Sequence, residues 1–293
     1  MLFSILVEIM NVKSEEEQMP TMQINGTHLE YMERGQGEPV ILVHGTLGDY
    51  RSWGLQMDAF AEKYHTISYS RRYHHPNPCN GDETDYSAAL HADDLAAFIK
   101  ELGLESAYVV GNSYGAFTAL FLAKNHPDSV RSMVLSEPPA LTLLENHPEG
   151  QPLKTGFLKE VWEPAAGLMK QGKTKEGVKT FVDSVVEKGA FDGFPQQVKE
   201  LIMDNACELR AETASPDYWT PITCEDAAKI HTPTLLLKGG KSVRMLQLVV
   251  EELERCLPNK ELITLSDSTH EMPSDDLEAF NRVVMDFLDK QAE

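Results

Sequence analysis

The sequence is poor in basic residues. It contains 26 Lys and Arg against 46 Asp and Glu among 293 residues, which gives a formal net charge of −20. A surface this acidic repels the phosphates of nucleic acids and the headgroups of anionic lipids. We therefore expect neither nucleic acid nor a membrane surface as a partner. The composition leaves the oligomeric state open.

Cysteine is also scarce. The four cysteines, Cys79, Cys207, Cys224 and Cys256, lie far apart and form no C-x-x-C pair. This spacing predicts neither a zinc site nor a disulfide framework. Free thiols are typical of a reducing compartment, so we expect a cytoplasmic protein.

Long apolar runs and nucleotide-binding loops are missing as well. The apolar start, MLFSILVEIM, is too short to span a bilayer and has no basic residue before it. Residues 1–20 are expected to form a loose extension. Neither G-x-G-x-x-G nor a P-loop pattern occurs, and we expect no cofactor and no metal.

Strand-like and helix-like patterns alternate along most of the chain, and this alternation indicates parallel strands joined by helical crossovers. Predicted strands span residues 21–24, 27–32, 39–43, 65–70, 107–110, 130–135, 233–237 and 261–265. Predicted helices span residues 51–63, 86–102, 116–125, 243–257 and 275–290. Asn25-Gly26 predicts a tight hairpin turn between the first two strands. The fold class is therefore α/β, with a mostly parallel eight-stranded sheet and helices on both faces.

Residues 140–222 interrupt this alternation. They contain helical patterns and no clear strand, so we expect a helical cap inserted into a core made of residues 21–139 and 223–293. Most apolar side chains of the cap should pack it onto the core, and a few should line an apolar pocket. The residues concerned are Phe157, Trp162, Leu168, Met169, Phe181, Phe191 and Phe194.

A G-x-S-x-G motif, Gly111 to Gly115, lies directly between a predicted strand and a predicted helix. In this position Ser113 occupies a sharp strand-to-helix turn, and the small residues beside it let strand and helix approach closely. The start of the helix places backbone N–H groups and positive partial charge beside the serine. Ser113 is the candidate nucleophile.

With this motif in place, residues 22–290 resemble the α/β-hydrolase superfamily. The resemblance depends on the His44-Gly45 loop after the third strand, the turn at Ser113, the helical cap and residues 268–272 before the last helix. It implies that His270 is the general base. It also implies that the backbone N–H groups of Thr46 and Tyr114 form the oxyanion hole. The Thr46 hydroxyl is a further possible donor.

The triad acid departs from the usual pattern. Superfamily members usually carry an Asp in the loop that here reads Gly239 to Arg244 and contains no carboxylate. Some members carry the acid at the end of the strand that follows the nucleophile helix, where this chain has Glu137. We predict Glu137 as the acid that orients His270, with Asp267 as the alternative.

Other clusters are interpreted as structural. His74-His75 and Cys79 could contribute to a metal site, but the prolines between them favour an irregular loop without metal. Arg71-Arg72 follows a strand that should end near the site, and an ordinary solvated pair is the favoured interpretation.

The predicted activity is hydrolysis of a carboxylic ester or lactone through an acyl-serine intermediate, without a cofactor. The expected substrate is a medium-sized, fairly hydrophobic small molecule. A carbon–carbon bond hydrolase of the same fold is the first alternative. An arginine near the pocket (Arg71, Arg72 or Arg244) would favour it by pairing with a substrate carboxylate. The second alternative is a ligand receptor or scaffold without turnover, which only the missing acid in the usual loop favours.

Overall fold

The computed structural model describes residues 19–80 and 83–292. Most of the extension expected at residues 1–20 therefore lies outside the described residues. Within the described part of the chain, no helix is both long enough and apolar enough to cross a membrane.

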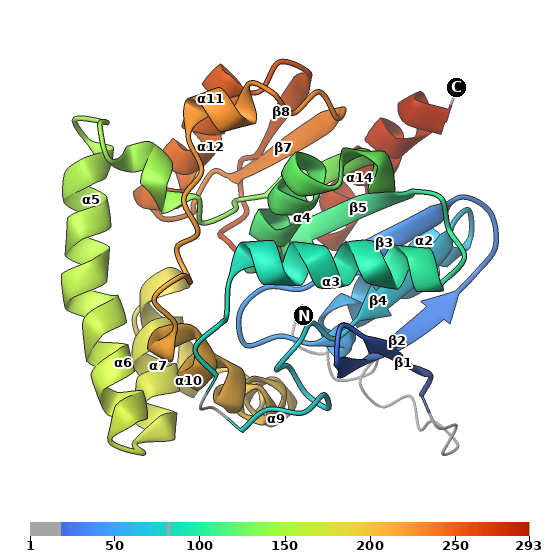
Figure 1. Ribbon diagram of the computed structural model, residues 1–293. Coiled ribbons are helices and arrows are strands. Elements are labelled where there is room, and N and C mark those ends of the chain that lie inside the picture. Colours follow the sequence, from blue (N-terminus) through green and yellow to red (C-terminus); the bar gives the residue numbers. More distant parts are fainter. Residues whose placement is uncertain (1–18, 81–82, 293) are drawn as a thin grey trace.

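The core is one eight-stranded sheet with the order β1-β2-β4-β3-β5-β6-β7-β8 (Figure 1). The strands are β1 (Thr21–Ile24), β2 (Thr27–Arg34), β3 (Pro39–Val43), β4 (His65–Tyr69), β5 (Ala107–Asn112), β6 (Val130–Ser136), β7 (Thr234–Gly239) and β8 (Lys260–Leu265). β2 pairs antiparallel with β1 and β4, and all other pairs are parallel. The predicted mostly parallel eight-stranded sheet is confirmed.

The hairpin between β1 and β2 turns at Asn25-Gly26, as the sequence predicts. Both residues have positive φ, 45° and 80°. This is the geometry of the tight turns that match strand twist. The Asn25 side chain also donates a hydrogen bond to Asp94 at 2.9 Å, which ties the hairpin to the helix behind it.

Helices cover both faces of the sheet because the central strands bury side chains on both sides. On β3, Ile41 and Val43 belong to one hydrophobic cluster, which includes residues of α3 (Ala88–Glu101), α4 (Tyr114–Asn125) and α12 (Arg244–Cys256). Val40 and Leu42 belong to a second cluster, with α2 (Gly54–Ala61) and α14 (Leu277–Ala292). Such two-sided burial is typical of parallel sheets.

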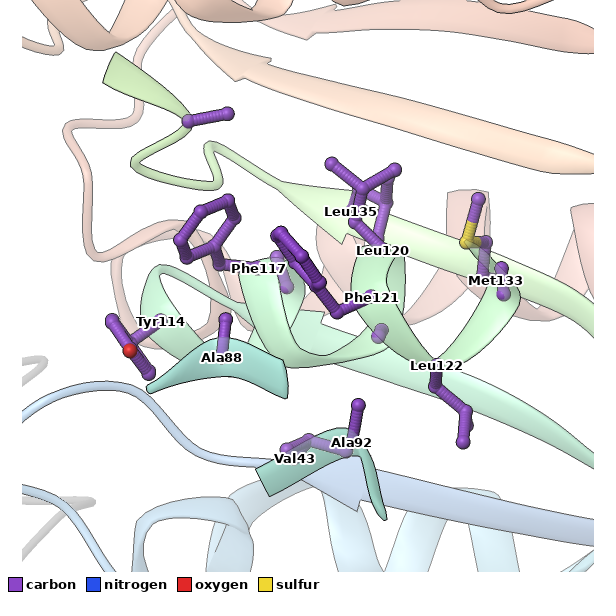
Figure 2. Packing of buried hydrophobic residues seen from close by; sticks show 14 of the residues in the cluster. Val43, Ala88, Ala92, Tyr114, Phe117, Leu120, Phe121, Leu122, Met133 and Leu135 are labelled. Carbon is purple, nitrogen blue, oxygen red and sulfur yellow. The ribbon is translucent and has the colours of Figure 1, made fainter. Parts of the chain in front are cut away.

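Figure 2 shows the first of these clusters. Phe117, Leu120 and Phe121 project from α4 toward Leu135 of β6, with Ala88 and Ala92 of α3 nearby. The helix that follows the serine turn is therefore held rigidly between the sheet and its neighbour. The turn at Ser113, next to the first residue of α4, is therefore held in a fixed position as well.

The chain between β6 and β7 forms a helical insertion, which lies to one side of the sheet (Figure 1). Its elements are η3 (Leu141–Leu144), α5 (Gly150–Phe157), the π-helical η4 (Leu158–Trp162), α6 (Glu163–Lys170), α7 (Thr174–Val185), α8 (Ala190–Gly193), α9 (Gln196–Asp204) and α10 (Ala206–Ala214). Met169, Phe181 and Phe191 are buried in a hydrophobic cluster of the insertion's own. Leu47 of the core loop also belongs to that cluster.

The remaining short elements connect these units. They are η1 (Tyr50–Trp53) before α2, η2 (Pro127–Ser129) before β6, α11 (Cys224–Ala227) before β7 and α13 (Met272–Asp275) before α14. Predicted helix and strand boundaries agree with the structure to within a few residues, which is the usual uncertainty of helix ends.

The expectation of four free thiols is wrong. Cys79 pairs with Cys207 of α10, and Cys224 pairs with Cys256 at the end of α12. The first pair is 128 residues apart in sequence and joins a core loop to the insertion. Only the folded chain brings these cysteines together, so their sequence spacing carried no signal. The expectation of a cytoplasmic location loses the support that free thiols supplied.

Candidate active site

Ser113 occupies the sharp turn between β5 and α4. Its φ of 52° and ψ of −123° are strained for a residue with a side chain. The turn is held because the Ser113 N–H donates to Ser136 O of the adjacent strand at 2.8 Å. The serine is half-buried and sits immediately before the first residue of α4. This is the geometry that G-x-S-x-G predicts for an accessible nucleophile.

The two glycines of the motif are needed for close approach. A Cβ at Gly115 would lie 2.0 Å from Val43 O, and a Cβ at Gly111 would lie 2.5 Å from Ala116 N. Both distances are far below van der Waals contact. The strand and helix therefore meet backbone to backbone at this point, as the sequence interpretation requires.

Glu137 and His270 meet in the structure although they are 133 residues apart. His270 Nδ1 lies 2.7 Å from Glu137 Oε2, with both side chains buried. Nδ1–H donates to the carboxylate, which leaves Nε2 as the basic nitrogen. Burial alone would lower the pKa of His270, but the hydrogen bond and negative charge of Glu137 outweigh it and raise that pKa.

The loop that lacks the usual acid supplies donors to Glu137 instead. Gly239 N–H donates to Glu137 Oε1 at 2.8 Å, and the Ser242 hydroxyl donates to Oε2 at 2.6 Å. Glu137 itself has a positive φ of 46°, which is uncommon for a residue with a side chain. A carboxylate held by two fixed donors is well suited to orient an imidazole.

Asp267, the alternative acid, lies elsewhere. Its carboxylate contacts Lys241 Nζ at 2.9 Å, and its side chain is 87% exposed. The structure therefore brings Glu137, and not Asp267, to His270.

Strand register explains why Ser113 and Glu137 are neighbours. Asn112 pairs with Ser136 across β5 and β6, and the two candidate residues follow directly after them. His270 lies in the loop after β8, which is also at the carboxyl end of its strand. Parallel strands bring their carboxyl ends to one edge of the sheet, where sites of α/β proteins form.

The two candidate oxyanion donors flank the serine. A Cβ at Gly45 would lie 3.1 Å from Ser113 Cβ, so the loop carrying Thr46 lies against the serine turn. Among the described residues, the backbone N–H groups of Thr46 and Tyr114 have no hydrogen-bond partner. The Thr46 hydroxyl is already engaged, because it donates to Glu212 Oε1 at 2.9 Å. The Thr46 hydroxyl is therefore not free to donate to an oxyanion.

Sequence reasoning missed two buried acids next to this loop, Glu208 and Glu212 of α10. Both are fully buried, and Glu208 Oε2 accepts the Leu47 N–H at 3.1 Å. Their spacing of four residues was an available signal, since like charges at this spacing destabilise an exposed helix. Nothing in the sequence indicated that α10 would face the loop after β3.

The residues considered for a metal site have structural roles. His74 Nδ1 lies 2.7 Å from Gly48 O, and Cys79 is bonded to Cys207. Within residues 19–80 and 83–292, no cluster of three or more potential metal ligands is present.

Comparisons with known proteins bear on the fold. A family model described as the alpha/beta hydrolase fold matches residues 38–166, which include the Ser113 turn and Glu137. The chain has the α/β-hydrolase fold. Its helical insertion between β6 and β7 and its mostly parallel sheet fit this assignment.

The proteins that this chain resembles carry names for different activities. The uncharacterized hydrolase YraK of Bacillus subtilis is 32% identical over 127 residues, which are 43% of this chain and 47% of YraK. A non-heme chloroperoxidase of Kitasatospora aureofaciens is 27% identical over 283 residues, or 91% of this chain and 98% of the relative. The structure of an enol-lactonase from Burkholderia xenovorans superposes with a TM-score of 0.72 at 20% identity, covering 92% of this chain and 99% of that one. This last likeness is one of fold.

Proposed function

We propose that the protein hydrolyses a carboxylic ester or lactone through an acyl-serine intermediate. The observation that carries this proposal is the buried 2.7 Å contact between His270 and Glu137 at the same sheet edge as the strained Ser113 turn. A nucleophile, an oriented base and free backbone donors are the parts that acyl transfer needs. The enol-lactonase fold neighbour is consistent with this reaction class.

The mechanism follows from these positions. His270 Nε2 takes the proton of Ser113 Oγ while Oγ bonds to the substrate carbonyl carbon, and the oxyanion accepts hydrogen bonds from the Thr46 and Tyr114 N–H groups. Collapse breaks the carbon–oxygen bond, and His270 gives its proton to the leaving alcohol oxygen. Water, deprotonated by His270, then attacks the acyl carbon. The bond between that carbon and Ser113 Oγ breaks, and His270 returns the proton to Oγ as the acid leaves.

The arginines that would have favoured carbon–carbon hydrolysis are engaged within the protein. Arg71 donates to His44 O, Gly45 O and the Tyr86 hydroxyl. Arg72 pairs with Asp94, and Arg244 pairs with Glu149 and Glu251. These arginines are therefore not available to pair with a substrate carboxylate. Ester or lactone hydrolysis is better supported than carbon–carbon bond hydrolysis. The receptor alternative is less well supported, because Glu137 contacts His270 from the end of β6 although the usual loop after β7 carries no acid.

Fluorophosphonate labelling followed by peptide mass spectrometry tests the proposal. An activated serine reacts covalently, so we expect a single adduct on the Ser113 peptide. Ser113→Ala is the matched control and should remain unlabelled. A panel of nitrophenyl esters and lactones then measures turnover. Folded wild-type protein that neither labels at Ser113 nor cleaves any ester or lactone would overturn the proposal.

The pH profile provides a second prediction. His270 must be neutral to accept the serine proton, and the Glu137 contact raises its pKa above the ordinary value of 6.5. We therefore expect kcat/KM to fall on the acidic side with a pKa above 6.5, when measured with a neutral ester substrate. A kcat/KM that stays constant down to about pH 5 would contradict an essential neutral histidine.

A further inference from the structure

Two acids of the insertion hold two consecutive residues of the loop beside Ser113. Glu208 Oε2 accepts the Leu47 N–H at 3.1 Å, and Glu212 Oε1 accepts the Thr46 hydroxyl at 2.9 Å. Glu208 and Glu212 are one helical turn apart on α10 and are fully buried. Their carboxyl groups therefore form a direct link between the insertion and the candidate oxyanion donor at Thr46.

The loop needs such support because its conformation is unfavourable by itself. Leu47 has a φ of 57°, in the left-handed region that side-chain-bearing residues avoid. Among the described residues, the backbone hydrogen bond that closes the turn is long, from Gly48 N to Gly45 O at 3.4 Å, and Arg71 and His74 of the core contact the carbonyl oxygens of Gly45 and Gly48. The Leu47 side chain lies in the insertion's hydrophobic cluster, so both its backbone and its side chain are held from that side.

The two buried carboxyl groups lie one helical turn apart and two adjacent buried anions repel each other, so a proton on one of them is favoured. Glu208 is the better anion, because it accepts from Leu47 N and from the Tyr86 hydroxyl at 2.7 Å. Tyr86 in turn accepts from buried Arg71 at 2.9 Å. Glu212 Oε2 is buried and has no donor among the described residues, so a proton on Glu212 is what satisfies it.

The electrostatics of the cluster agree with this assignment. Burial and the adjacent Glu208 charge raise the pKa of Glu212 well above its ordinary value. Burial alone would raise the pKa of Glu208, but the His74 ring, whose Nε2 lies 3.1 Å from Glu208 Oε1, and the charge of Arg71 outweigh it and lower that pKa. The other ionisable groups facing the pair are the phenols of Tyr86, Tyr114 and Tyr218, whose pKa values burial raises, so they stay neutral.

We propose that Glu208 and Glu212 are positioning residues that share one proton and hold the oxyanion loop in place from the insertion. This inference rests on the proposed function of Ser113, since it assigns the pair a role in placing the Thr46 N–H donor. The oxyanion hole is then complete only when α10 is docked. The pair itself does not contact the reacting atoms.

Three variants test the proposal with the esters that wild type cleaves. Glu212→Ala removes the acceptor of the Thr46 hydroxyl, and we expect kcat to fall about 10- to 100-fold with KM changed less than about threefold, because a misplaced donor weakens transition-state binding. Glu212→Gln presents an oxygen to Thr46 and an N–H to Glu208, as a protonated acid does, and should keep kcat within about threefold. Glu200→Gln, at an exposed carboxylate of the same insertion, is the matched control.

Infrared spectroscopy gives a readout that does not depend on activity. With ¹³C-labelled glutamate, the wild-type minus Glu212→Gln difference spectrum at neutral pH should contain a protonated-carboxyl band. Taking the difference isolates Glu212 from other acids with a raised pKa, such as Glu271. Absence of the band, an unchanged kcat in Glu212→Ala, or equal losses in Glu212→Ala and Glu212→Gln would each overturn the proposal. Failure of Ser113 labelling in wild type would instead count against the proposed function and leave the infrared test in force.

Discussion

Replacing Glu137 by Gln should lower kcat about 10⁴-fold while leaving the protein folded. The carboxylate now accepts from His270 Nδ1–H and from two further donors, Gly239 N–H and the Ser242 hydroxyl. A Gln amide has only one acceptor oxygen, so its N–H₂ would face a donor. The imidazole would then favour the other tautomer and could no longer accept the Ser113 proton at Nε2. Steady-state kinetics and circular dichroism measure the two effects separately.

Asp267→Asn is the matched control for this prediction. It makes the same acid-to-amide change at the other acid considered for the triad, which is exposed and contacts Lys241. We expect its kcat within about twofold of wild type, since surface substitutions of this kind have small effects. The opposite ranking of the two variants would show that Asp267, and not Glu137, supports the histidine.

Replacing Gly115 by Ala should destabilise the protein by at least about 3 kcal/mol. The added Cβ would lie 2.0 Å from Val43 O and 2.5 Å from His44 O. Both obstacles are backbone atoms of β3 and the loop after it, so no side-chain rotation relieves the clash. Either α4 moves away from the sheet, which opens the Ser113 turn, or the strand shifts and displaces Thr46. Chemical denaturation measures the change in the free energy of unfolding.

Gly167→Ala tests whether the effect comes from the clash. Gly167 lies within α6, and a Cβ there would meet nothing within 4 Å. The same substitution should stabilise the protein by about 0.5–1 kcal/mol, because alanine favours a helix over glycine. A Gly115→Ala protein as stable as wild type would contradict the close backbone contact at the serine turn.

The sequence by itself determined the sheet, the order of its helices and the place of Ser113, the candidate nucleophile. These follow from local patterns: continuous apolar strands such as Pro39–Val43, the Asn25-Gly26 turn, and G-x-S-x-G between a strand and a helix. Such features can be predicted from the sequence because hydrophobic periodicity, turn residues and small residues determine the local structure of a few consecutive positions. The resemblance built on them is what pointed to His270.

Only the tertiary structure decided which distant groups meet. It brought Glu137 to His270 and left Asp267 exposed, and it paired cysteines that are 128 and 32 residues apart. It also set Glu208 and Glu212 against the loop at Thr46, although α10 lies more than 160 residues further along the chain. Such contacts depend on how the insertion docks on the core. No spacing or periodicity along the chain encodes that docking, because it results from packing between surfaces assembled from separate segments.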